Sequence, residues 1–250
     1  MSIAEKLTTI AENEQRVYDS GYKSFWKAYQ SNGNQIYGAQ YMFSGVRWND
    51  YTFYPMYDIV LYGNSSYVFA YNNVSNLRER MNQQGVTIRL NSVTTMSNFF
   101  WNAKTKEIPT INLNGVKYVD RFCQNCTNLT TIPAMDFSTC QEFSYFVSGC
   151  SALKTIELIN FSSATSLSNA FTGCSALEDI TVDGVNKLSI NFSACSKLTI
   201  ESLRSIISAL YDFVGNGETT TRTLTLHATA KARLTEADIK TITDKGWTLV

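Results

Sequence analysis

The sequence predicts an α/β solenoid, in which each unit of the chain adds one short parallel strand and a short helix or turn to a stack. Three observations predict this fold. A Cys-x-x-Leu phrase occurs four times, at Cys126, Cys150, Cys174 and Cys195. Apolar positions recur from position 88 to position 200 with a period of about 23 to 24 residues, within the range of known repeat proteins. Amphipathic helix patterns flank this region. A fixed period of this kind indicates stacked units that bury a continuous core.

Five apolar positions keep step with the period. The set returns in the next unit and then in two more, and its first members are Leu90, Val93, Met96, Phe99 and Ala103. An isoleucine marks the same period at Ile108, Ile132, Ile156 and Ile180. A period of this length with Leu-x-x-Ile at its centre lies in the range of leucine-rich repeats. We therefore expect a leucine-rich-repeat solenoid over residues 88–200, with about five to seven units in the whole chain once degenerate ones are included.

Each unit should contribute one rung to the stack. Residues 153–158 and 177–182 are expected to form parallel strands, with Leu153, Ile156 and Leu158 pointing inward. Residues 144–149 and 168–173 are expected to form a helical turn on the opposite wall, which a glycine closes.

The cysteines indicate packing rather than chemistry. Six cysteines in 250 residues are too few for a disulfide framework, and four of them occupy equivalent repeat positions. Ala103 stands at the same position one unit earlier, so the position requires a small apolar side chain. We expect a buried ladder of free thiols, with Cys123 and Cys140 outside it.

Two further regions precede the repeats. Residues 1–34 should form a helical leader, because Ser2 and Glu5 make a capping-box pattern before an amphipathic stripe that could dock onto the body or self-associate. Residues 35–87 are rich in Tyr, Phe and Trp. We interpret them as degenerate repeats whose aromatic side chains fill the core, with a carbohydrate-binding surface as the alternative.

Residues 201–250 should close the stack as an α/β cap. An amphipathic helix over 203–214 has Thr199 as a candidate N-cap and leaves at Gly215, and residues 223–227 alternate like a strand. A second capping box, formed by Thr235 and Asp238, precedes a helix that should stop near Lys245, before a closing strand over 247–250.

Composition argues against several classes of partner. With 21 basic and 21 acidic residues the formal net charge is zero, which argues against nucleic acid. No run approaches the roughly 18 consecutive apolar residues of a membrane span, so we expect no membrane insertion. The first residues also lack the pattern of a signal peptide.

Catalytic and metal-binding motifs are weak. The single CxxC, from Cys123 to Cys126, has no second pair, and His227 is the only histidine. Glu157 and Asp179 could face each other across adjacent rungs, but carboxylates on an open face are usually solvated. Neither Walker nor Rossmann glycine patterns occur. We expect a protein that is not an enzyme and has no metal or cofactor.

The segment 170–180, Ala-Phe-Thr-Gly-Cys-Ser-Ala-Leu-Glu-Asp-Ile, resembles the repeat of BspA-type bacterial leucine-rich-repeat proteins. Residues 2–10 and 25–30 also resemble the leaders of prophage-encoded proteins that carry such repeats. The resemblance implies adhesion to host matrix proteins or other cells. It implies a location at the cell surface, outside the cell or on a phage particle.

We therefore expect binding of a protein or glycan through the strand face of the solenoid. The candidate contact residues are polar positions at or near the outward side of adjacent rungs: Thr131, Thr155, Glu157, Asp179 and Thr181. The alternative is a structural or receptor-recognition component of a phage particle that assembles through the N-terminal helix. A monomer is expected in the first case and an oligomer in the second.

Overall fold

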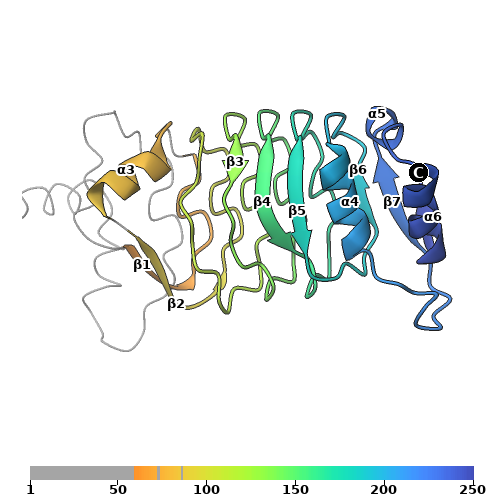
Figure 1. Ribbon diagram of the computed structural model, residues 1–250. Coiled ribbons are helices and arrows are strands. Elements are labelled where there is room, and N and C mark those ends of the chain that lie inside the picture. Colours follow the sequence, from red (N-terminus) through yellow and green to blue (C-terminus); the bar gives the residue numbers. More distant parts are fainter. Residues whose placement is uncertain (1–58, 72–73, 86) are drawn as a thin grey trace, which may run out of the picture.

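The computed structural model describes residues 59–71, 74–85 and 87–250 (Figure 1). The predicted leader over residues 1–34 and much of the aromatic-rich tract lie outside the described residues. The strands are β1 (Ile59–Asn64), β2 (Ile88–Thr95), β3 (Thr131–Ile132), β4 (Thr155–Asn160), β5 (Asp179–Asp183), β6 (Ile190–Phe192), β7 (Arg222–Leu226) and β8 (Trp247–Leu249). The helices are α3 (Leu77–Gln84), α4 (Ile200–Ala209), α5 (Ala228–Lys231) and α6 (Glu236–Asp244).

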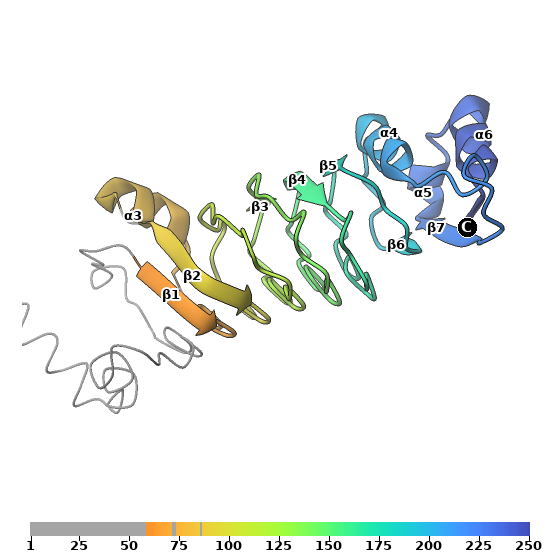
Figure 2. The ribbon, with the colours of Figure 1, turned by 90° about the horizontal axis from the view of Figure 1, so that it is seen from below.

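Successive turns of the chain stack along one long axis, from β1 at one end to α6 at the other (Figures 1 and 2). The strands form parallel sheets with the orders β1-β2, β3-β4-β5 and β6-β7-β8. Thr131 pairs with Thr155 and Thr155 with Asp179, so each residue pairs with its equivalent in the next repeat. A second line of bridges joins Tyr118 to Glu142 and Glu142 to Ser166, and it has the same spacing. The register thus confirms the period predicted from the sequence.

The repeated apolar positions form one continuous core. The leucine and isoleucine of each rung are almost completely buried, and aromatic rings stack between turns, with ring centroids 5.8 Å apart for both Phe99 and Phe122 and Phe122 and Phe146. Full burial of such a side chain contributes about 1.5–3 kcal/mol. That contribution is available only when the next turn is in place.

One inward position in β4 differs from the prediction. Ile156 pairs with Ile180, but the next pair is Ile159 with Val182, so β4 carries one extra residue in a β-bulge. The bulge places Ile159 in the core and leaves Leu158 partly exposed. The prediction that Leu158 points inward is therefore wrong, because the one-residue shift transfers its position to Ile159.

The wall opposite β3–β5 is not helical. We call it the turn wall and define it as residues 97–102, 120–125, 144–149 and 168–173. The backbone N–H groups of Tyr145, Val147 and Gly149 each donate to a carbonyl in the following turn of the chain. Intervening N–H groups, such as that of Ser148, donate three residues back. An α-helix directs its N–H groups four residues back along the chain. Residues 144–149 and 168–173 form turns instead, so the prediction of a helical turn is wrong for both segments.

Left-handed backbone makes this pattern of turns feasible. In one turn the left-handed residues are Tyr145, with a φ of 57°, and Gly149, with a φ of 79°. In the next they are Asn169 and Gly173, with φ of 55° and 78°. Asn and Gly tolerate this conformation better than other residues do. This explains the Gly-Cys pairs of the repeat.

The described part of the aromatic tract is divided between core and surface. Phe69 is completely buried, and its ring centroid lies 5.4 Å from that of Phe99. Tyr71 is 46% exposed and makes an edge contact with Trp101. The prediction of core packing is confirmed for Phe69, whereas Tyr71 lies at the surface.

The elements of the C-terminal cap agree with the prediction. Thr199 caps α4, Thr235 and Asp238 form the capping box of α6, and β7 and β8 are present. Helix α4 ends at Ala209, several residues earlier than predicted. The reason is tertiary, because the ammonium group of Lys245 donates to the carbonyls of Ile207, Ser208 and Leu210, at 2.9–3.0 Å.

Candidate recognition surface

The five predicted contact residues all lie on β3, β4 and β5, which face the viewer between α3 and α4 in Figure 1. Thr131, Thr155 and Asp179 are direct register partners. Neighbouring strands in a sheet are about 4.8 Å apart, so these three residues form a row across the strands.

The other two residues are not direct partners. Because of the bulge in β4, Glu157 and Leu158 together lie opposite Thr181. The side chain of Glu157 accepts a hydrogen bond from the N–H of Ala134 in the preceding turn, at 3.0 Å. Glu157 therefore helps to hold two turns together.

Asp179 also has a structural partner. Its carboxylate accepts a hydrogen bond from the hydroxyl of Thr199, the N-cap of α4, at 3.2 Å. The sequence suggested that Glu157 and Asp179 could form an acid–base pair. In the structure each carboxylate instead accepts a hydrogen bond from a different neighbouring segment. By contrast, the hydroxyls of Thr131, Thr155 and Thr181 form no hydrogen bond with any part of the chain that the structure describes, so they are available to a ligand.

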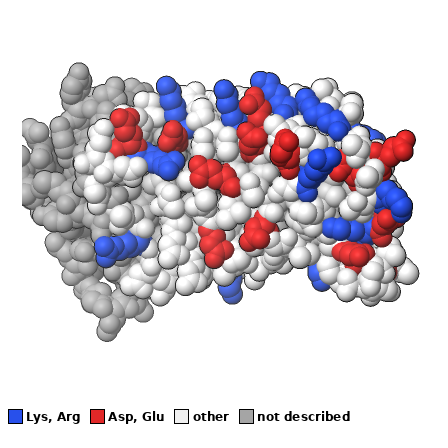
Figure 3. All heavy atoms as spheres, in the orientation of Figure 1, with Lys and Arg blue, Asp and Glu red and all other residues white. Residues whose placement is uncertain are grey.

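Charges of both signs are interspersed over this side of the molecule (Figure 3). Some are paired, as in the contact of 3.6 Å between Lys197 and Glu178 and that of 3.5 Å between Arg78 and Glu107. Exposed pairs of this kind contribute little to stability. A face of mixed sign is suited to a partner that carries both donors and acceptors.

A shallow hollow of about 410 Å³ lies at the other end of the same strands, where β4 and β5 end. Its lining combines the polar residues Asp136, Asn160 and Asp183 with the apolar residues Met135 and Leu158. Sequence reasoning did not select these residues. The sequence feature that could have identified them is their spacing, because Asp136 and Asn160 occupy equivalent positions in successive repeats.

The cysteines of the ladder are buried, as predicted. The thiol of Cys126 donates to the carbonyl of Phe100, that of Cys150 to Cys123, and that of Cys174 to Val147, at 2.9, 2.9 and 3.2 Å. Burial raises the pKa of Cys174 to about 12, and it also raises the pKa of Cys150. Because the thiolate is the reactive form, Cys150 and Cys174 are poor nucleophiles at neutral pH.

His227 occupies a structural position. It is the N-cap of α5, and its Nδ1 accepts a hydrogen bond from the N–H of Thr229 at 3.1 Å. Within residues 59–71, 74–85 and 87–250, no three or more His, Cys, Asp or Glu side chains are placed to hold a metal ion. None of the helices in these ranges is long and apolar enough to cross a membrane.

Comparison with known proteins gives no relative: no family model, no curated protein and no solved structure matches this chain.

Proposed function

We propose that the chain is a leucine-rich-repeat solenoid of the BspA type and serves as a non-enzymatic binding module for an extended protein or glycan segment. The observation that carries the proposal is the row of Thr131, Thr155 and Asp179 on adjacent parallel strands. Each turn presents one polar group to the same face. An extended ligand that crosses the strands would meet such a group about every 5 Å.

The geometry favours the threonines as ligand contacts. Asp179 and Glu157 already accept hydrogen bonds within the protein, whereas Thr155 and Thr181 are not engaged in this way by the described residues. The hollow at Asn160 and Asp183, at the other end of β4 and β5, would receive a side chain or a sugar unit of a ligand that runs along the strands. Because they keep these internal hydrogen bonds, the two carboxylates would contribute less to ligand binding than the threonines do.

Binding should first be sought with a glycan array and a panel of extracellular matrix proteins. The double variant Thr155→Arg with Thr181→Arg places one long charged side chain on the row and a second one beside it on β5. We expect it to weaken binding of any captured ligand by at least roughly tenfold, as is usual when a central contact is lost. The measurement is a dissociation constant by surface plasmon resonance.

The matched control is Thr172→Arg, an exposed position on the turn wall. It adds the same side chain to the opposite side and should change binding by less than about twofold. Circular dichroism should show that both variants keep the parental fold. If a ligand binds the double variant and the parent equally well, β3–β5 is not the recognition surface.

A further inference from the structure

We propose that Asn114 is a site of spontaneous deamidation, in which the backbone nitrogen of Gly115 is the nucleophile and water is the co-reactant. Asn-Gly pairs are prone to this reaction because glycine has no side chain to shield its nitrogen. Among the described residues such pairs occur at Asn114 and at Asn216. The structure distinguishes the two.

Asn114 and Gly115 are the central residues of a tight turn that is open to solvent. The turn is closed by a hydrogen bond of 2.9 Å from the N–H of Val116 to the carbonyl of Leu113. Both central residues are exposed, and no atom lies within 4 Å of the position that a Cβ on Gly115 would take. The side-chain amide of Asn114 and the N–H of Gly115 form no hydrogen bond with the described residues. Nothing in these ranges therefore holds the two reacting groups apart.

The same turn recurs in the next two units without this pair. Ser138 and Thr139 occupy the central positions in one, and Ser162 and Ser163 in the other. Each is closed by an equivalent hydrogen bond of 2.9 Å, from Cys140 to Phe137 and from Ala164 to Phe161. The fold does not require Asn-Gly at this corner, so the reactive pair is particular to one turn.

The reaction balances without an oxidant or a reductant. The nitrogen of Gly115 forms a bond to Cγ of Asn114, the bond from Cγ to Nδ2 breaks, and the amide proton leaves with that nitrogen as ammonia. Water then opens the cyclic imide at either carbonyl, giving aspartate or isoaspartate. The isoaspartate product adds one methylene to the main chain between Leu113 and Val116, which are both completely buried.

Asn216 is an internal comparison, because both of its reacting groups are engaged. The N–H of Gly217 donates to the carbonyl of Val214 at 2.9 Å, and Nδ2 of Asn216 donates to the carbonyl of Asp212 at 2.6 Å. Both hydrogen bonds must break before the nitrogen can attack Cγ. In the folded chain we expect Asn216 to react at least roughly tenfold more slowly than Asn114.

The full-length protein should be incubated at mildly alkaline pH and digested with trypsin, and the peptides 107–117 and 205–222 followed by mass spectrometry. We expect a mass increase of about 1 Da in peptide 107–117 well before peptide 205–222 changes. The variant Asn114→Gln should abolish that increase while leaving peptide 205–222 as it was. In concentrated urea the two rates should converge, because the protection of Asn216 depends on the fold.

Two results would overturn the proposal. One is equal rates for the two peptides in the folded chain. The other is an unmodified Asn114 in the folded chain under conditions in which the urea-unfolded chain reacts, which would mean that the turn protects it.

Discussion

At the scale of single residues, the turn wall depends on side chains that tolerate left-handed backbone. Asn125 and Gly149 occupy equivalent positions in adjacent turns, with φ of 60° and 79°. They also fit against each other, because a Cβ on Gly149 would clash with the side-chain oxygen of Asn125. Glycine is therefore required at 149 for two separate reasons, its backbone conformation and the space available.

Replacing Gly149 with alanine should separate these two reasons. Gly217 has a similar φ of 71° but no atom within 4 Å of an added Cβ, so Gly217→Ala carries only the conformational cost. We expect Gly149→Ala to lower the free energy of unfolding by about 1 kcal/mol more than Gly217→Ala does. Urea unfolding followed by circular dichroism measures both. Equal losses would show that Asn125 moves aside at no cost.

The thiol ladder illustrates how a repeated residue can suggest chemistry that the site does not support. Cys126 and its equivalents point into the core and donate to carbonyls of the preceding turn. Ala103 is completely buried at the same position, where it lacks a thiol. Small size is thus the property that the position requires, and the raised pKa values of Cys150 and Cys174 follow from burial.

At the scale of elements, α4 terminates the β3–β5 sheet with side chains in place of another strand. The hydroxyl of Ser202 accepts from the N–H of Ile180 at 3.0 Å, and that of Ser205 accepts from the N–H of Val182 at 2.8 Å. The Ser202 hydroxyl also donates to the carbonyl of Glu178 at 3.1 Å. The edge of β5 is therefore satisfied and covered, which protects it from pairing with another chain.

Removing one of these hydroxyls should be costly. Ser202→Ala leaves a buried N–H of Ile180 without its partner, and we expect a loss of about 1–3 kcal/mol in the free energy of unfolding. Ser208→Ala is the control, because Ser208 is exposed and donates within its own helix. Its effect should stay within about 0.5 kcal/mol. Amide hydrogen exchange should show faster exchange at Ile180 in the first variant only; unchanged exchange there would contradict the capping role.

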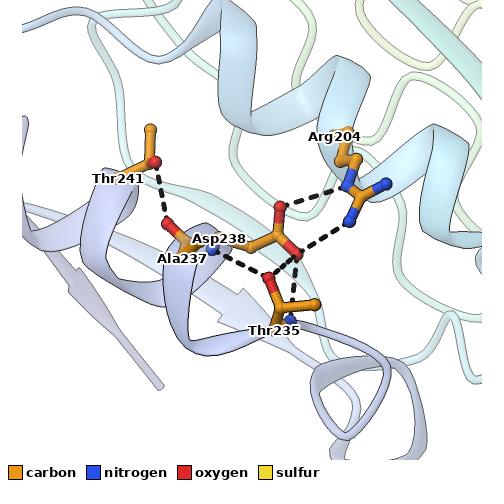
Figure 4. Close-up of polar contacts among 5 residues, drawn as sticks. All are labelled: Arg204, Thr235, Ala237, Asp238 and Thr241. Carbon is orange, nitrogen blue, oxygen red and sulfur yellow. Dashed lines mark hydrogen bonds and ion pairs between the residues drawn. The ribbon is translucent and has the colours of Figure 1, made fainter.

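A single carboxylate joins α4 to α6 (Figure 4). Asp238 accepts hydrogen bonds from the guanidinium of Arg204 at 3.1 and 3.4 Å, and from the hydroxyl and N–H of Thr235. The bond from Arg204, followed by those from Thr235, lowers the pKa of Asp238 to about 2. The ionised form is thus favoured in the folded chain.

The pH dependence of stability should report this link. An unpaired Asp has a pKa of about 3.9, so the stability contributed by Asp238 is fully present above about pH 4 and is lost as the pH falls towards 2. We expect the parent to be more stable than Asp238→Asn near neutral pH, with the difference shrinking over that acid range. Midpoints of urea unfolding at several pH values measure it. Asp244→Asn, which removes an exposed pair with Lys240, should have little effect. If the stability difference between the parent and Asp238→Asn does not change with pH, the contact between Asp238 and Arg204 is not its source.

At the scale of the whole molecule, each turn depends on its neighbours. Both walls donate backbone hydrogen bonds to adjacent turns, and the apolar side chains are buried only between turns. Stability in such a stack is a sum of nearest-neighbour contributions, and the terminal unit must cover the last rung. Here α4 and α6 cover one side of the end, and β6–β8 form the other (Figure 2).

Removal of the cap should therefore expose the stack. In a chain that ends at Thr199, the edge of β5 would lose the cover of α4 and the hydroxyls that bind the N–H groups of Ile180 and Val182. We expect this chain to self-associate, whereas the full chain keeps its β5 edge covered. Size-exclusion chromatography with light scattering compares their masses. A monomeric truncated chain with unchanged circular dichroism would show that the cap is dispensable.

The sequence alone was sufficient to predict the period, the inward positions of most rungs and the elements of the C-terminal cap. These features are encoded locally, because a buried position repeats in every unit and a capping residue such as Thr199 or Thr235 acts on the first turn of its own helix. The row of Thr131, Thr155 and Asp179 follows from the same period. The recognition role of that row is a proposal that the binding experiment tests.

Tertiary structure decided where each backbone and side-chain hydrogen bond goes. It placed Ile159 rather than Leu158 in the core, directed alternate N–H groups of the turn wall to the next turn, and engaged Glu157 and Asp179 with neighbouring segments. The partners involved lie about one repeat period apart in the sequence, so no local pattern specifies them. A polar group is satisfied by whichever partner the packing brings within reach, and only the stacked turns determine that partner.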